Sequence, residues 1–95
     1  MSTKQDLIDE VCTHLGIRNF LVSTGSTEPK EFLLAIVDQL GIVGLSSGMD
    51  KHELGKLIVE ACGEMWLPEY DSVGGTITKE GLQAIKLSVF KLTSE

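Results

Sequence analysis

The chain repeats itself, and this internal repeat limits its possible folds more than any other feature of the sequence. A shift of 47 residues aligns residues 4–16 with 51–63, and a shift of 49 residues aligns residues 23–36 with 72–85. The second alignment contains eight identities: Ser23/Ser72, Gly25/Gly74, Thr27/Thr76, Lys30/Lys79, Glu31/Glu80, Leu33/Leu82, Ala35/Ala84 and Ile36/Ile85. Average residue usage would give about one identity in so short a window. We interpret the two halves, approximately residues 4–40 and 51–92, as copies of one unit.

Each copy has the apolar spacing of two helices joined by a glycine-containing loop. Apolar residues recur at intervals of three and four in four segments: Leu7/Ile8/Val11/Cys12/Leu15, Phe32/Leu33/Ile36/Val37/Leu40, Leu54/Leu57/Ile58/Ala61/Cys62 and Leu82/Ile85/Val89/Leu92. A single helical pair of this size cannot bury its own apolar face. The sequence therefore predicts an all-α or mainly α fold, in which four helices pack about a pseudo-two-fold axis into one domain, 1–95.

Polar residues mark where the helices begin. Ser2 with Gln5, and Asp50 with Glu53, have the spacing of capping boxes, and Thr78 can cap the last helix. Two β-like runs in the long loops, residues 20–22 and 75–77, can add a small β pairing between the two copies.

Composition narrows the class of protein. The 95 residues are 42% hydrophobic and contain no apolar run of the kind that crosses a bilayer, so we expect no membrane partner. The N-terminal segment lacks the charge pattern of an export signal, so we expect a cytoplasmic protein. The formal net charge of −6 opposes long-range attraction of nucleic acid, so any such contact must be local.

The repeated loops have the composition of phosphate-binding segments. In both copies, a loop containing glycine, serine and threonine leads into a helix whose first turn carries a lysine. Backbone N–H groups, small hydroxyls, the positive end of a helix dipole and an ammonium group all bind phosphate oxygens. Two such sites related by a two-fold axis would face the two backbones of double-stranded DNA. The predicted contacts are Ser23, Gly25, Ser26, Thr27, Lys30, Ser72, Gly74, Gly75, Thr76 and Lys79.

The needs of the fold explain the same residues without any ligand. Serine and threonine cap helices, glycine permits tight turns, and a Lys-Glu pair is ordinary surface in a first helical turn. The loops also lack the Gly-Lys-[Ser/Thr] ending of a nucleotide-binding P-loop, so nucleotide hydrolysis is not indicated.

The second long loop suggests a different function, which is binding to a protein. Met65, Trp66 and Tyr70 place large apolar groups on a loop of an acidic chain. Such side chains are frequent anchors at interfaces, either with a partner protein, with a second copy or with further domains of the same chain. Trp66 can equally fill the core between the two copies, because tryptophan is usually well buried.

The sequence shows no catalytic or metal-binding constellation. His14 and His52 lie on predicted helices without a serine or cysteine in a triad relation, and Cys12 and Cys62 fall within apolar faces. These four residues do not have zinc-finger spacing, so we expect no metal, no cofactor and no enzymatic activity.

The second copy resembles a helical segment in the N-terminal regions of prokaryotic restriction-endonuclease-type proteins. The resemblance is carried by Glu53-Leu54-Gly55-Lys56-Leu57-Ile58, Cys62-Gly63, Trp66, Asp71-Ser72-Val73-Gly74-Gly75-Thr76-Ile77-Thr78 and Gly81-Leu82. It covers about half of the chain directly, and the first copy only through the repeat. The chain has neither a Pro-Asp and Asp/Glu-x-Lys nuclease signature nor a His-Asn-His metal finger. The resemblance therefore implies a non-catalytic accessory domain of a DNA-processing or defence protein.

Overall fold

The computed structural model describes residues 3–22, 27–46, 48–72 and 74–94. Within these residues the chain forms four α-helices: α1 (Lys4–Leu15), α2 (Lys30–Leu40), α3 (Lys51–Ala61) and α4 (Lys79–Thr93). A short 3-10 helix, η1 (Pro68–Tyr70), precedes α4. The predicted all-α fold of four helices is confirmed.

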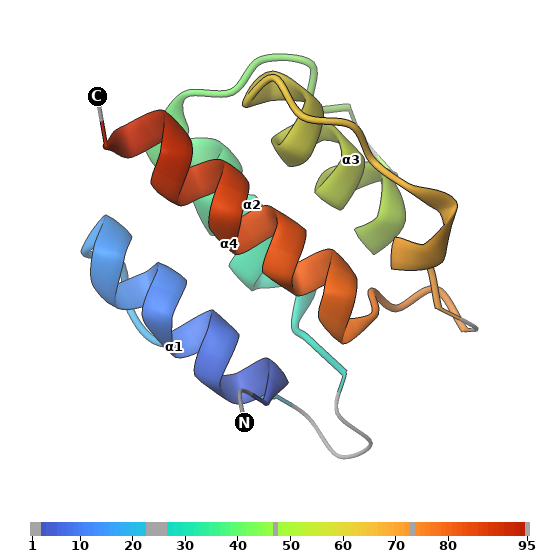
Figure 1. The fold of residues 1–95 in the computed structure, drawn as a ribbon, viewed down its shortest axis with the longest axis horizontal. Helices are drawn as coiled ribbons and strands as arrows, with labels where there is room; N and C mark the ends of the chain where they lie inside the picture. The colour runs from blue at the N-terminus through green and yellow to red at the C-terminus, as the bar shows by residue number, and fades with distance from the viewer. Residues whose placement is uncertain (1–2, 23–26, 47, 73, 95) are drawn as a thin grey trace.

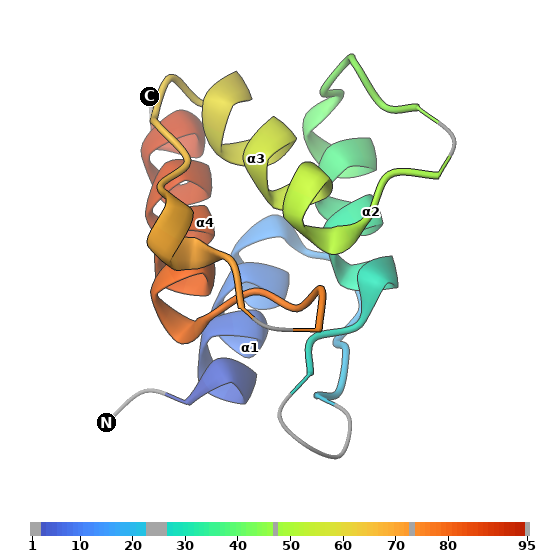
Figure 2. The same ribbon diagram turned by 90° about the vertical axis from the view of Figure 1, so that its right-hand side faces the viewer.

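All four helices run in the same general direction. In both views, each helix begins toward the lower side of the molecule and ends toward the upper side (Figures 1 and 2). Neighbouring helices with this arrangement need connections that travel back along their length. The 12 residues of α1 rise by about 18 Å, and an extended chain needs only about six residues to cover that distance. The connections at 16–29, 41–50 and 62–78 are therefore long enough, and all four helix N-termini face the same end.

The core is shared by all four helices. Helix α4 packs against α1 and α3, and α2 packs against α3. The long loops add Phe20 and Ile77 to this core. The fully or almost fully buried apolar residues are Leu7, Ile8, Val11, Cys12, Phe20, Phe32, Leu33, Ile36, Val37, Leu54, Ile58, Val59, Ile77, Leu82, Ile85 and Val89.

The start of α1 differs from the sequence prediction by one residue. The N-cap is Thr3, which forms a capping box with Asp6. Ser2, the predicted cap, lies outside the described residues, and its predicted partner Gln5 points elsewhere. The predicted box of Asp50 is present at the start of α3.

The side chain of Gln5 holds the first long loop, where the sequence predicted a strand pairing. Its side-chain nitrogen donates to Phe20 O at 2.8 Å, and its side-chain oxygen accepts from Val22 N at 2.8 Å. One amide side chain thus replaces the neighbouring strand that residues 20–22 were predicted to pair with. A β-bridge joins Asp71 to Ile77 inside the second loop, and residues 20–22 have no strand or bridge assignment. The expected pairing of 20–22 with 75–77 is therefore wrong, because the Gln5 side chain uses those backbone groups.

Candidate functional site

The side chain of Glu28 joins the loop before α2 to the loop before α4. It is fully buried, and its Oε1 accepts a hydrogen bond from Ile77 N at 2.7 Å. Thr76 Oγ1 lies 2.9 and 2.8 Å from the two carboxylate oxygens. Lys4 Nζ lies 3.5 Å from Oε2. A backbone amide, a hydroxyl and an ammonium group together satisfy this carboxylate, as a buried charge requires.

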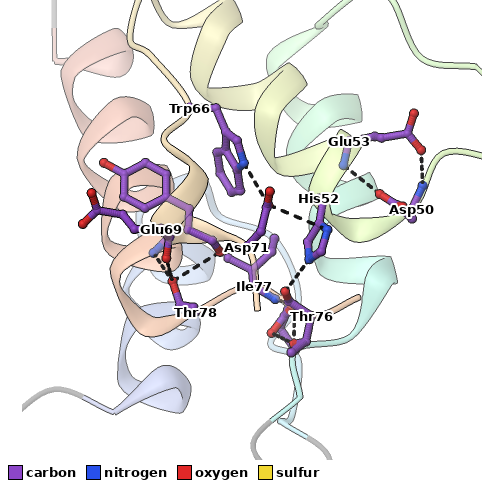
Figure 3. A network of polar contacts seen from close by, with 12 residues as sticks. Asp50, His52, Glu53, Trp66, Glu69, Asp71, Thr76, Ile77 and Thr78 are labelled. Carbon is purple, nitrogen blue, oxygen red and sulfur yellow. Dashed lines mark hydrogen bonds and ion pairs between the residues drawn. The ribbon is translucent and has the colours of Figure 1, made fainter. Parts of the chain in front are cut away.

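His52 of α3 holds the second loop from the other side (Figure 3). His52 Nε2 lies 2.6 Å from Thr76 O and carries the proton of this bond, because a carbonyl oxygen only accepts. His52 Nδ1 faces Asp71 Oδ1 at 3.7 Å. The same Asp71 oxygen accepts from Trp66 Nε1 at 3.0 Å, and Thr76 O also accepts from Ser72 N at 2.9 Å. The Asp71 carboxylate and the Thr76 carbonyl are therefore both engaged within the chain, although the Asp71 side chain stays 41% exposed.

Thr78 closes the start of α4. Its Oγ1 accepts from Gly81 N at 3.2 Å and lies 3.2 Å from both Glu69 O and Tyr70 O, to which the hydroxyl can donate. Its backbone N–H donates to Tyr70 O at 2.9 Å. Within the chain, Thr78 thus accepts hydrogen bonds from two backbone N–H groups of the first turn of α4, those of Gly81 and Leu82.

The residues predicted to contact phosphate lie in different environments in the structure. Ser23, Gly25 and Ser26 lie outside the described residues. Thr27 is half-buried beside Glu28, and Thr76 uses both its hydroxyl and its carbonyl within the chain. Ser72 uses its backbone N–H in the same way. Gly74 and Gly75 are exposed and have φ values of 85° and 80°, which a turn needs and glycine permits.

The lysines do share one end of the molecule. Lysine is the first residue of every α-helix: Lys4, Lys30, Lys51 and Lys79. Acidic residues accompany them, one in each first turn and one immediately before α3: Asp6, Glu31, Glu53, Glu80 and Asp50. Carboxylates therefore outnumber lysines among these residues, and this end is not a cationic surface.

Trp66 packs inward and does not stand free. A methyl group added at Gly55 of α3 would lie 2.6 Å from Trp66 Cη2, so the indole rests directly on the helix backbone. Tyr70 meets the indole edge to face, with ring centroids 5.1 Å apart. Of the three predicted partner-binding residues, Met65 is the most exposed, at 73%. The structure thus separates Met65 from Trp66, although the two are adjacent in sequence.

A groove lies between the second loop and the outer side of α4. We call it the α4 groove; its lining residues are Val59, Glu64, Met65, Tyr70, Ala84, Leu87, Ser88 and Lys91. Leu87, which is 66% exposed, and Met65 both line this groove. Sequence reasoning found Met65 and Tyr70 but missed Leu87. The signal was available, because Leu87 falls between the core positions of α4.

A second apolar groove lies between α2 and the connection at 41–50. Leu34 and Leu45 line two adjoining hollows there, which also receive Val37, Ile42 and Met49. Lys30 and Asp38 stand at its borders.

Other chemistry is not brought together in the described part of the chain. Burial raises the pKa of the Cys12 and Cys62 thiols above the ordinary value, so neither is an activated nucleophile. No group of three His, Cys, Asp or Glu side chains there has an arrangement that could hold a metal ion. No helix there has the length and apolar character that a membrane span requires.

Comparisons of the chain with protein-family models, with curated proteins and with solved structures gave no match.

Proposed function

We propose that this chain is a non-catalytic accessory domain that associates with a second copy of itself through the α4 groove. The supporting observation is that two exposed apolar side chains, Met65 and Leu87, line one groove together with Val59 and Ala84. Apolar side chains beside a hollow are the usual centre of a protein interface.

The charges around this face oppose a second copy less than the rest of the surface does. A chain with a net charge of −6 repels its own copies over most of its surface. Two ion pairs border the outer side of α4: Glu64 with Lys91 at 2.5 Å, and Glu10 with Lys86 at 2.7 Å. Because these charges are already paired within the chain, the strip between them is nearly neutral.

The shape of α4 suits a two-fold contact. In a symmetric dimer the same surface is used twice, so Leu87 of one copy would enter the hollow beside Ala84 and Ser88 of the other. A standard interface covers roughly 800 Å² of each partner, which is a modest part of the 5366 Å² accessible surface. One face of α4 with the 64–70 loop is of the right scale.

The test is sedimentation equilibrium of the chain over a wide range of concentrations. We expect the wild type to convert from monomer to dimer, and Leu87→Glu to raise the dimer Kd at least tenfold, or about 1.4 kcal/mol. Leu21→Glu is the matched control, because Leu21 is 77% exposed and lies in the first loop, away from the groove. A wild type that stays monomeric at millimolar concentration, or equal effects of the two substitutions, contradicts the proposal.

Association with double-stranded DNA is a second candidate, supported by the four lysines that begin the helices at one end. Lys30 is exposed, and Lys79 is half-exposed, so both can reach a phosphate. The nearby carboxylates and the net charge of −6 weaken this candidate, which is why we place it second.

The DNA candidate is tested by binding of a short duplex at several salt concentrations. We expect wild-type affinity to fall as salt rises, and Lys30→Ala/Lys79→Ala to reduce both the affinity and the salt dependence. Lys56→Ala is the control, because Lys56 is exposed in the middle of α3. Absence of binding even at about 50 mM salt removes this candidate.

Both candidates are compatible with the resemblance to accessory regions of restriction-endonuclease-type proteins. We also propose that the protein is located in the cytoplasm. Association through α4 would place two copies of any attached domain side by side, as DNA-processing proteins that act on a two-fold duplex require.

A further inference from the structure

Glu28 occupies a place that is chemically suited to an anion from outside the chain. The donors around it are one backbone amide, one hydroxyl and one ammonium group: Ile77 N, Thr76 Oγ1 and Lys4 Nζ. A planar carboxylate or a phosphate oxygen accepts hydrogen bonds from the same set. We call these three donors and the space they enclose the junction cradle.

Two of the three donors, Thr76 Oγ1 and Ile77 N, belong to the second copy, while Lys4 and the occupant Glu28 both belong to the first. Under the shift of 49 residues, Glu28 aligns with Ile77, the residue whose amide it binds. One copy therefore supplies a charged side chain where the other supplies an apolar one. The Glu28 side chain is fully buried, so a large part of the cost of burying its charge must be offset by these donors.

We propose that the junction cradle is an anion-binding site that the chain fills with its own Glu28, an autoinhibitory contact that excludes carboxylate or phosphate groups of other molecules. The proposal is independent of association through the α4 groove, because the two sites share no residue. It also explains why Thr76, a predicted phosphate contact, is engaged within the chain.

The experiment removes the Glu28 carboxylate and keeps the three donors of the junction cradle. Glu28→Ala is titrated with sodium acetate and, separately, with inorganic phosphate, against sodium chloride at the same ionic strength. The readouts are the Tm and the amide resonance of Ile77. We expect a saturable rise in Tm and a saturable shift of the Ile77 resonance for Glu28→Ala, because a ligand that binds only the folded state stabilises it. Acetate and phosphate arms distinguish a carboxylate preference from a phosphate preference.

Three control proteins define the result. The wild type and Glu28→Gln still have a filled cradle and should respond to acetate no more than to chloride. Glu28→Ala/Thr76→Val lacks the hydroxyl donor and should lose most of the response. If Glu28→Ala is unfolded in chloride, the titration follows recovery of helical circular dichroism instead.

The proposal fails if acetate and phosphate affect Glu28→Ala no more than the wild type, or if the Thr76→Val double variant responds equally. It also fails if an unfolded Glu28→Ala regains no helix in either anion. None of these outcomes bears on dimer formation, which is measured separately with the wild-type chain.

Discussion

The two halves that the sequence alignment pairs place their bulky side chains differently at two aligned positions. In the first copy the helices carry the bulk, with Ile8 on α1 and Phe32 on α2 both buried. The alignments place Gly55 and Gly81 at these two positions in the second copy. There the loop supplies the missing volume: Trp66 packs on Gly55, and Ile77 and Tyr70 pack on Gly81. At these two pairs of aligned positions, the bulk therefore lies on the helices in the first half of the chain and on the loop in the second.

This difference teaches why only the second loop is rich in large side chains. Glycine on a helix face lets a loop approach the helix backbone closely, and the loop must then be shaped to fit. In the first copy the helix side chains fill most of the core, the loop adds Phe20, and the Gln5 amide and the Glu28 carboxylate hold the loop by hydrogen bonds.

Removing bulk from a helix of the first copy should have the largest effect. Phe32 is 1% exposed and meets Phe20 edge to face, so we expect Phe32→Ala to lower the free energy of unfolding by about 3–5 kcal/mol. Urea unfolding followed by circular dichroism measures this. Leu34→Ala on the same helix is the control, because Leu34 is 36% exposed and should cost much less. Equal losses would show that α2 does not carry the bulk of its copy.

Removing the Gln5 amide, which holds the first loop, should cause the second-largest loss in the free energy of unfolding. We expect Gln5→Ala to lower the free energy of unfolding by about 1–3 kcal/mol, because Phe20 O and Val22 N both lose their partner. Hydrogen exchange of the Val22 amide should also become faster. Gln39→Ala, at an exposed position of α2, provides a control with the same chemical change. A Val22 amide that exchanges at the wild-type rate would contradict the account of this loop.

Adding bulk to a helix of the second copy is the opposite change, and we expect it to cause a smaller loss in the free energy of unfolding. A methyl group at Gly55 would press on the indole of Trp66. Overpacking costs about 1–3 kcal/mol, and alanine recovers up to about 1 kcal/mol of helix propensity, so we expect a net loss for Gly55→Ala. Emission of Trp66, the single tryptophan, should shift to the red.

A double-mutant cycle tests the cause of that loss. In a Trp66→Phe background the smaller ring relieves the contact, so Gly55→Ala should cost less or become stabilising. If the two substitutions act additively in urea unfolding, Trp66 does not limit the size of residue 55.

The smallest expected difference in stability concerns the N-caps of α2 and α4, the second helix of each copy. The alignment pairs Pro29, which makes no side-chain cap to α2, with Thr78, which caps α4. We expect Thr78→Ala to cost about 1 kcal/mol, and Pro29→Ala to cost less, since it removes only a restriction on the unfolded chain. Thermal unfolding of both variants measures the difference. A larger loss for Pro29→Ala would reverse the comparison.

Much of the helical framework could be predicted because its signals are local. The apolar spacing, the Asp50 capping box and the Thr78 cap involve residues within a few positions of one another. The first capping box was misplaced because Thr3 with Asp6 and Ser2 with Gln5 have identical spacing. Gln5 was free to hold the first loop, which is why the expected β pairing is replaced by side-chain hydrogen bonds.

The candidate sites were harder to predict, because they join residues far apart in the chain. Glu28 meets Thr76 and Ile77 across 48 and 49 positions. Met65 and Leu87 line the same groove although they are far apart in the chain, while Trp66, the neighbour of Met65, packs on Gly55. The sequence predicted the same partner-binding role for Trp66 and Met65, and only their tertiary environments distinguish them.

Sequence by itself determined that the chain is helical and where most helices begin, because hydrogen bonding within a helix depends on near neighbours and the apolar period. Tertiary structure decided which polar groups remain available, because a donor that suits a phosphate equally suits a carboxylate brought from the other half. The packing of the second loop on two glycines decided in the same way which apolar side chains stay exposed, since only those not needed to fill space can meet a partner.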